Sequence, residues 1–475
     1  MSTSPNNEPH CSPMVQSKTE TQVPELEDDN RLQSVQQSSL ADLHPPCIAS
    51  LVPIEIWCKI FGLATHIPGA YDIDDYAAIA AFARDTDGIC ISNRFKATMD
   101  TKLACSLVCK YWNAIIQRFL FEYIRIRSGA QACAVAEALA KIPQGEDAKD
   151  GPGKWTIRVD LALEGVHSWS SSHDEAMSRI FGCCRNLVCF STVFSSGTFP
   201  DRPKENGLPT EVIQYLWPGQ NPRLKRLEIL FSGWGVLPGI EAAFGNSLEV
   251  LWIDTPRYTL RKWEGRLLFP KVRTLIATPC CGALLHQLQL PNIRACVVED
   301  EESPISFIPN TRLVEYVSLS DSRAVFCGFD AWQNLATLSV EMEALISFDI
   351  TKDFQLPSLE CILIHGMEFW DLCQTIAREN NDLYSNGPIS RIQGNLTRIV
   401  ARSSCPNLRW AKIFRPVHAL RYRQSVADEG REFWTNWVRT CNAHGIRLGV
   451  SDGGAEWSGD EWKEVTHDEI SVNYN

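Results

Sequence analysis

A spaced apolar triplet recurs along the middle of the chain. Each copy places hydrophobic residues at its first, fourth and sixth positions, as Leu224, Leu227 and Ile229 do in the first copy. This pattern predicts a short strand in each copy, with the last two triplet members on its inward side. Successive copies begin 24, 24, 21, 21, 21, 24 and 49 residues apart. The later copies are Leu248/Leu251/Ile253, Val272/Leu275/Ala277, Ile293/Cys296/Val298, Val314/Val317/Leu319, Leu335/Leu338/Val340, Leu359/Ile362/Ile364 and Leu408/Ala411/Ile413.

Proline precedes most of these strands. It stands two places before the first apolar residue in five of the eight copies, at Pro222, Pro270, Pro291, Pro357 and Pro406. Proline there ends the preceding segment before the strand begins, because it lacks an N–H and disfavours helix in the residue before it. The pair Leu187 and Phe190 marks an earlier unit, although its third position is Thr192.

Steps of this length are typical of leucine-rich repeats, whose period is about 20 to 29 residues. The chain from roughly residue 180 to 415 resembles degenerate leucine-rich repeats. The Asn or Cys that usually follows the triplet is mostly absent, with Asp254, Asp321 or His365 near that place. Within the long step, Met367–Asn380 has the pattern of a full helix. An ordinary α/β domain whose buried strands happen to recur is the alternative.

Helical patterns come before the repeats. Pro53 suits the start of a helix, and Glu55 in its first turn complements the helix dipole. Ile56, Ile60 and Leu63 then follow at helical spacing, with Phe61 beside them. Such a helix is too apolar to stay uncovered.

A second helix is predicted with Val108, Trp112, Ile115 and Phe119 along one stripe, and a short strand is expected at Tyr123–Ile126. Two short helices of this kind bury part of their apolar surface in each other. The remainder needs a partner or another domain to cover it, and a helix laid across it would suit.

The stretches Leu51–Phe61 and Leu103–Trp112 together resemble the F-box of ubiquitin-ligase receptors. Many fungal F-box proteins carry degenerate leucine-rich repeats of the kind that the later part of this chain resembles. Val52 replaces the usual Leu, and a long insertion, Thr65–Thr101, separates the halves. The insertion holds Asp72, Asp74 and Asp75, followed by an apolar run, Ala77–Ala83, that is expected to form its own helix. An amphipathic helical hairpin at the edge of a larger domain is the alternative. The resemblance implies docking on a Skp-family adaptor through Val52, Pro53, Ile54, Glu55, Ile56, Ile60, Phe61, Leu63, Leu103, Leu107, Val108, Cys109, Trp112 and Ile115.

The two resemblances together imply an α/β protein in which an N-terminal helical F-box precedes an irregular leucine-rich-repeat solenoid with a C-terminal helical cap. The cap is expected from the amphipathic helix Arg431–His444 and a final strand at Ile446–Val450. The expected segments are a disordered acidic region at 1–45, the F-box at 46–127 with its insertion at 65–101, the repeats at 128–415, the cap at 416–450 and a disordered acidic tail at 451–475.

Side chains that neighbour the inward triplet members are expected to line an exposed concave face, where repeat proteins usually bind their partners. Aromatic residues on that face are candidate anchors. Its acidic residues favour a basic target segment. The candidates are Arg226, Glu228, Trp252, Asp254, Tyr316, Glu341, His365, Trp410 and Lys412.

Charge and composition narrow the function further. The formal net charge is −12, of which residues 1–45 carry −5 and residues 452–475 carry −6, so the rest of the chain is nearly neutral. A nearly neutral body argues against nucleic acid as a partner. The chain begins without the pattern of a secretory signal and contains no long apolar run, so we expect no membrane association and a cytoplasmic or nuclear location.

Catalytic and metal-binding patterns are missing from the sequence. We find no nucleophile elbow, phosphate loop, dinucleotide fingerprint or zinc-protease motif. Cys280, Cys281 and His286 lack a second ligand pair, so neither a metal nor another cofactor is expected. The resemblance implies a non-catalytic receptor subunit of a cullin–RING ubiquitin ligase. An F-box scaffold without a ligase role and a plain repeat-based binding protein remain alternatives.

Overall fold

The computed structural model divides the chain into two compact units, Met1–Val52 and Pro53–Asn475. Of the first unit, only Leu51 and Val52 are described, so the predicted disorder at 1–45 lies outside the described residues. The predicted helix Met367–Asn380 also lies outside them. The structure describes residues 51–84, 89–140, 151–163, 169–194, 223–230, 237–254, 265–278, 281–298, 308, 310–319, 332–341, 345, 355–365, 388–401, 404–413, 437–450, 455–457 and 462–464.

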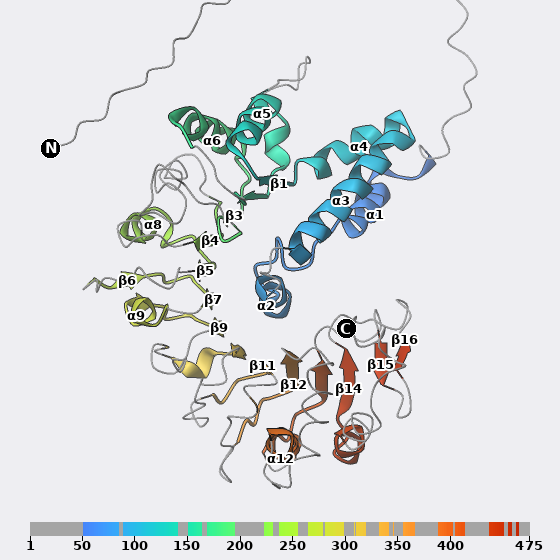
Figure 1. The fold of residues 1–475 in the computed structure, drawn as a ribbon, viewed down its shortest axis with the longest axis vertical. Coiled ribbons are helices and arrows are strands. Elements are labelled where there is room, and N and C mark those ends of the chain that lie inside the picture. Colours follow the sequence, from blue (N-terminus) through green and yellow to red (C-terminus); the bar gives the residue numbers. More distant parts are fainter. Residues whose placement is uncertain are drawn as a thin grey trace, which may run out of the picture. The chain divides into compact units, whose positions relative to one another are not determined.

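The second unit mixes helices with a large, mainly parallel sheet (Figure 1). The strand order is β1-β2-β3-β4-β5-β7-β9-β10-β11-β12-β13-β14-β15-β16, and β6 and β8 form a separate parallel pair. The strands are β1 (Tyr123–Ile126), β2 (Arg158–Leu161), β3 (Cys189–Ser191), β4 (Arg226–Leu230), β5 (Val250–Asp254), β6 (Leu267–Leu268), β7 (Thr274–Ala277), β8 (Leu288–Gln289), β9 (Ala295–Val298), β10 (Tyr316–Leu319), β11 (Thr337–Glu341), β12 (Cys361–His365), β13 (Trp410–Ile413), β14 (Arg447–Val450), β15 (Ala455–Trp457) and β16 (Trp462–Glu464).

The predicted triplets form strands that pair in register. Leu227 of β4 lies opposite Leu251 of β5, which lies opposite Leu275 of β7. The row continues through the fourth triplet position of every later copy and ends at Ala411 of β13. Each copy therefore contributes one strand to a single parallel sheet, as the spacing predicted.

The sheet begins earlier than the triplets do. The strand expected at Tyr123–Ile126 is β1, and it pairs in parallel with β2. Phe190 of β3 lies opposite Leu227, so the pair Leu187 and Phe190 does mark an earlier strand. The polar residues Arg158 and Asp160 interrupt the apolar pattern of β2, which is why the sequence did not reveal that strand.

Helices pack on the triplet side of the sheet and form the main core with it. Met177 and Phe181, Ile240 and Leu396 are among the helical residues buried against the triplets. The helices are α1 (Ile54–Ala64), α2 (Tyr76–Arg84), α3 (Ile89–Val108), α4 (Lys110–Leu120), α5 (Gly129–Ala140), α6 (Ser171–Cys183), α8 (Leu237–Phe244), α9 (Gly282–Leu285) and α12 (Pro388–Val400), with short 3₁₀ helices η2 (Pro152–Trp155) and η5 (Thr311–Leu313). Among the described helices, none has the length and apolar composition needed to cross a lipid bilayer.

The segment expected to form one helix around Val108 and Trp112 forms two. Cys109 adopts an extended conformation between α3 and α4, and its sulfur accepts a hydrogen bond from the Trp112 backbone N–H at 3.4 Å. It therefore caps the N-terminus of α4, although sulfur is only a weak acceptor. Val108 consequently ends α3 and does not continue the stripe of Trp112 and Phe119.

The C-terminal part confirms one expectation and corrects another. Residues 437–443 are helical, Gly445 follows at a positive φ of 71°, and β14 is the expected final strand. Residues 431–436 of the predicted cap helix lie outside the described residues. The tail was expected to be disordered, but β15 and β16 lie within it, and β15 continues the sheet by pairing antiparallel with β14.

Candidate functional site

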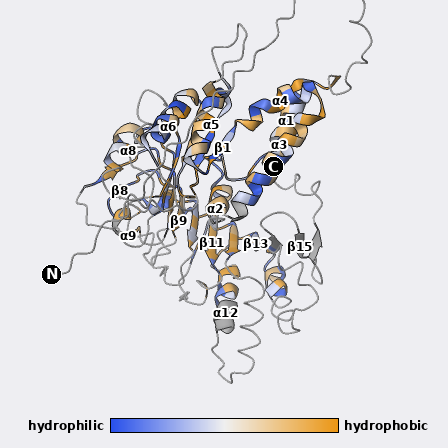
Figure 2. Ribbon diagram, turned by 45° about the horizontal axis from the view of Figure 1, so that its top comes forward, coloured by the Kyte–Doolittle hydropathy of each residue, from blue (hydrophilic) through white to orange (hydrophobic). Residues whose placement is uncertain are grey.

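The three helices α1, α3 and α4 leave a concentrated set of apolar side chains in contact with solvent. Leu63 is 82% exposed and Leu107 is 84% exposed. Of the nine large exposed hydrophobic residues in the described part of the second unit, seven belong to α1 or α3, and hydrophobic residues predominate along α1 in Figure 2. These seven are Ile54, Ile56, Ile60, Leu63, Leu103, Leu107 and Val108. We call them the helical apolar set.

A small core of their own holds these helices together. Trp57 of α1 packs on Trp112 of α4 with ring centroids 4.6 Å apart, and Phe61 lies 5.0 Å from the same ring. Ile115 and Phe119 complete this core. Because the interior is already filled, the helical apolar set is free to contact another molecule.

Some of the predicted adaptor residues are therefore exposed, and others are buried in this small core. Phe61 is 2% exposed and Ile115 is 4% exposed, so both belong to the core and not to the surface. Trp112 is half-buried and packs against Trp57 and Phe61, and Cys109 serves as a helix cap. Among the other candidates, Pro53 and Glu55 are exposed, while Val52 belongs to the first unit.

The predicted concave face exists as a shared side of the strands, but most of it is covered. The register places Asp160, Glu228, Trp252 and Ile276 in one row across β2 to β7. The prediction that the candidates on this face are exposed is wrong for five of them. Arg226, Glu228, Trp252, Tyr316 and His365 are all buried. Asp254, Glu341, Trp410 and Lys412 are half-buried.

The cover comes from the segment that was expected to be an insertion, residues 65–101. Ile79 and Phe82 of α2 join Trp252, Ile276 and Tyr316 in one buried cluster. Ile67, Ala70, Ala80 and Ala83 of the insertion belong to the same cluster. The expected helix at Ala77–Ala83 is thus α2, and it lies on the face where a target was expected. We call residues 65–84 the cover.

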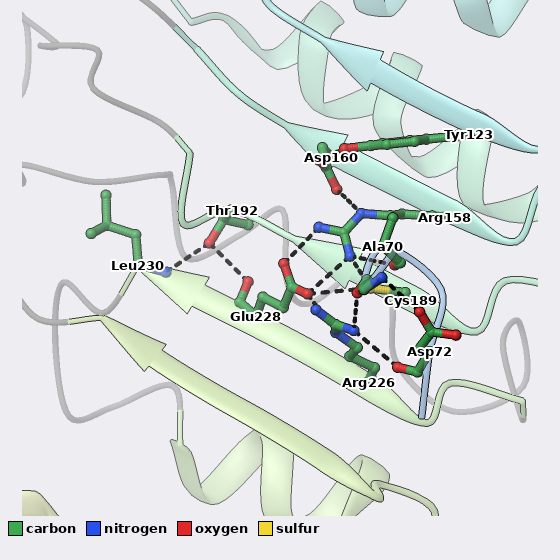
Figure 3. A network of polar contacts seen from close by, with 11 residues as sticks. Ala70, Asp72, Tyr123, Arg158, Asp160, Cys189, Thr192, Arg226, Glu228 and Leu230 are labelled. Carbon is green, nitrogen blue, oxygen red and sulfur yellow. Dashed lines mark hydrogen bonds and ion pairs between the residues drawn. The ribbon is translucent and has the colours of Figure 1, made fainter. Parts of the chain in front are cut away.

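Backbone carbonyls of the cover are bound by two arginines of the sheet (Figure 3). Arg226 donates from Nη1 to the carbonyl oxygens of Gly69 at 2.6 Å and Asp72 at 2.9 Å. Arg158 donates from Nη1 to the carbonyl oxygen of Ala70 at 2.8 Å. Side-chain recognition of main-chain carbonyls holds the turn before α2 in one position.

The same arginines form a buried ion-pair network. Arg158 Nε lies 2.7 Å from Asp160 Oδ1, and its Nη2 lies 2.7 Å from Glu228 Oε2. Arg226 Nε lies 2.6 Å from Glu228 Oε1, and all four side chains are fully buried. Burial opposes ionisation of Glu228, but the two arginines prevail and lower its pKa to about 2.

Local geometry makes the turn of the cover stiff. Gly69 has a positive φ of 80°, and a Cβ there would lie 2.2 Å from the carbonyl oxygen of Ala78. Its N–H donates to Asp72 Oδ2 at 2.6 Å. At the next acidic position, Asp74 forms an ion pair with Arg273 at 2.6 Å. Only glycine permits this close approach between the turn and the helix that follows.

One signal in the sequence could have revealed the cover. The strands Val250–Asp254, Thr274–Ala277 and Ala295–Val298 are almost continuously apolar, without the polar alternation of a solvated face. Strands buried on both faces have this composition. The triplets occupy one side of each strand, and the other side was expected to face solvent.

Beyond this cluster, the same face carries cations beside an aromatic ring. Lys412 Nζ lies 5.4 Å from the ring centroid of Trp410, and the Arg447 guanidinium carbon lies 5.3 Å from it. Arg447 sits opposite Trp410 in the strand register. The less covered part of the face therefore carries cations at Lys412 and Arg447 as well as the carboxylates of Asp254 and Glu341.

Comparison with protein-family models and with curated proteins found no match for this chain. The assignment of function consequently rests on the residues and their geometry.

Proposed function

We propose that the chain is a substrate-recognition subunit of a cullin–RING ubiquitin ligase. In this proposal, α1, α3 and α4 form an F-box that docks on a Skp-family adaptor. The strands form an irregular leucine-rich-repeat solenoid that presents a target protein. The location expected for such a receptor is cytoplasmic, nuclear or both.

The helical apolar set is the observation that carries the proposal. Seven hydrophobic side chains on α1 and α3 are exposed to water, which is unfavourable in free energy and typical of an interaction surface. Full burial of a leucine side chain contributes about 1.5 to 3 kcal/mol, so covering Leu63 and Leu107 alone would contribute substantially to adaptor affinity. A helical adaptor surface is the kind of partner that suits such side chains.

The proposed chemistry is proximity. A receptor that binds its target holds a lysine of that target near the charged conjugating enzyme and so raises its effective concentration. No covalent step is assigned to this chain. Its contribution would be two binding surfaces on one connected fold, since β1 follows α4 directly and is the first strand of the sheet.

Adaptor capture tests the proposal. Full-length wild type is compared with a double variant, Leu63→Asp and Leu107→Asp, in a pull-down with a purified Skp-family adaptor. Both side chains are exposed, so the variant is expected to fold normally and to lose adaptor binding at least 100-fold. Leu268→Asp is the matched control, because Leu268 is an exposed leucine of β6 outside the helices.

Three outcomes separate the possibilities. Binding by wild type and control, with loss in the double variant, supports adaptor docking. Absence of binding by folded wild type contradicts it and leaves a repeat-based binding protein. Adaptor binding without transfer of ubiquitin to a bound partner in a reconstituted ligase would indicate an F-box scaffold.

A further inference from the structure

The cover leaves several polar groups of the sheet unpaired. Within the described part of the chain, Nε and Nη1 of Arg125, Nη2 of Arg226 and Nε1 of Trp252 are buried without a hydrogen-bond partner. The hydroxyl groups of Thr274 and Ser318 are in the same condition. These residues lie on β1, β4, β5, β7 and β10. Buried donors without acceptors cost free energy, and native structures contain few of them.

All of these residues belong to the covered face. Arg125 lies opposite Asp160 and places its guanidinium carbon 5.6 Å from the ring of Phe194, which is part of the covered cluster. Thr274 lies opposite Val250, and Ser318 lies opposite Val297, both in that cluster. The cover thus matches the apolar and aromatic part of the face but leaves much of its hydrogen-bonding capacity unused.

The charges on the covered face are also unequal. Arg125, Arg158 and Arg226 bring three positive charges, whereas Asp160 and Glu228 bring two negative charges. The two carboxylates bond to Arg158 and Arg226, and the ring of Phe194 is the contact found for the Arg125 guanidinium. A carboxylate from another segment would supply the missing charge and accept charge-assisted hydrogen bonds.

The composition of the cover shows which kind of segment fits. Residues 66–84 carry Asp72, Asp74 and Asp75 against Arg84, together with an alanine-rich helix. Asp74 reaches Arg273, and the ring of Phe82 lies 4.8 Å from the guanidinium carbon of Arg158. The cover is therefore an acidic turn followed by an apolar helix with one aromatic side chain above the arginines.

We propose that this face is the target-binding surface, that the cover occupies it in cis, and that the target is an acidic, apolar helical segment that displaces the cover. The proposal rests on the proposed function and specifies the chemistry of its target. The nearly continuous apolar strands require that something always covers the face. The target supplies acceptors to Nε and Nη1 of Arg125 and to Nη2 of Arg226, which have no hydrogen-bond partner beneath the cover among the described residues.

An attached competitor lowers the apparent affinity for a free segment by the fraction of molecules whose face is open. Weakening the cover must therefore strengthen binding in trans. The probe is a fluorescein-labelled peptide with the sequence of residues 66–84, measured by fluorescence anisotropy against the full-length protein. The weakened form carries Asp74→Ala and Phe82→Ala, which remove the ion pair to Arg273 and the ring above Arg158.

We expect the weakened form to bind the peptide at least tenfold more tightly than wild type does. Ala77→Ser is the matched control, because Ala77 is an exposed residue of the same helix, and this variant should bind like wild type. Arg273→Met in the weakened form should reduce binding about threefold, because Asp74 of the peptide loses its ion pair with Arg273. A peptide with asparagine in place of Asp72, Asp74 and Asp75 should also bind at least tenfold more weakly.

Equal or undetectable binding by folded wild type and folded weakened protein would show that the cover is a permanent part of the fold and would overturn the proposal. If the weakened form does not fold, a full-length chain with residues 66–84 replaced by a Gly/Ser linker of equal length takes its place. If neither the weakened form nor the linker variant folds, the proposal is also overturned, because a cover required for folding cannot be displaced.

Adaptor capture, measured in parallel, separates the two proposals. The helical apolar set is distinct from the covered face. Adaptor binding without peptide binding therefore contradicts the displaceable cover alone. Peptide binding without adaptor binding contradicts the ligase role and supports a protein that binds acidic segments.

Discussion

Arg226 Nη1 donates a hydrogen bond of 2.6 Å to the carbonyl oxygen of Gly69, a residue 157 positions earlier in the chain. This bond connects a strand of the sheet to the cover, residues 65–84. It explains why a side chain expected to contact a target in solvent is fully buried. The consequences of that burial can be measured.

Removing the charge of Arg226 should destabilise the protein strongly. Arg226→Met leaves the carbonyls of Gly69 and Asp72 unpaired and leaves Glu228 with Arg158 as its remaining arginine partner. Breaking a buried ion pair from one side costs about 3 to 5 kcal/mol, which urea denaturation should report. Arg409→Met, at an exposed position, is the control and should change the free energy of unfolding by less than about 0.5 kcal/mol. A loss below about 1 kcal/mol for Arg226→Met would contradict the role of the network.

Stability should depend on acid through Glu228. Its pKa falls from 4.5 in the ordinary state to about 2 in the folded protein. A lowered folded pKa contributes stability that is present above about pH 4.5 and is lost as the pH falls toward 2. The contribution is on the order of 3 kcal/mol, since each pKa unit corresponds to about 1.4 kcal/mol. Urea denaturation between pH 5 and pH 2 should show a shallower decline for Glu228→Gln than for wild type; parallel curves would refute this assignment.

Lys102 should limit stability near neutral pH. Its side chain is fully buried, Nζ has no hydrogen-bond partner among the described residues, and burial lowers its pKa to about 8. Because the folded pKa lies below the unfolded value of 10.5, stability should rise as the pH increases from 8 toward 10.5. Lys102→Met should raise the free energy of unfolding at pH 7 by about 1 to 3 kcal/mol. Thermal melts of wild type and of Lys102→Met at pH 7 and pH 10 test this. A melting temperature of Lys102→Met at pH 7 that equals or lies below that of wild type would contradict it.

Substitution of Gly69 should loosen the cover. In Gly69→Ala the new Cβ meets the carbonyl oxygen of Ala78, and the positive φ adds strain of about 1 to 3 kcal/mol. Hydrogen exchange of the amides of α2 should accelerate by at least fivefold. Gly182→Ala is the matched control, since a Cβ there meets nothing within 4 Å in helix α6. The control should be neutral or stabilising by up to about 1 kcal/mol. Equal exchange rates in both variants would show that the turn tolerates a side chain.

Sequence periodicity predicted the strands better than it predicted their surroundings. The fourth triplet positions from Leu227 to Ala411 do align across the sheet, because alternation along a strand depends on local backbone geometry. The strand β2 was missed because it contains the charged residues Arg158 and Asp160. Arg158 is paired in the fold by Ala70 and Glu228, which lie in distant segments of the chain. A charged residue is normally a sign of solvent, and only its tertiary partners show otherwise.

For the candidate adaptor surface too, the sequence predicted the helices but not which of their side chains are buried. Helical spacing found Ile56, Ile60 and Leu63, which the structure leaves exposed. Spacing could not separate them from Phe61, which the aromatic rings of Trp57 and Trp112 enclose. The break at Cys109 also escaped the pattern, because an apolar stripe continues through it.

By itself, the sequence determined the local elements: an apolar helical region that starts after Pro53, a helix within the insertion, and repeated strands of regular spacing. These follow from periodicity and backbone preference over a few residues. Only the tertiary structure decided that the insertion lies across the sheet, that Arg158 and Arg226 bind its carbonyls, and that the expected target surface is buried. Those outcomes depend on contacts between residues more than 80 positions apart, where the free energy of burying charge and apolar surface together selects the arrangement.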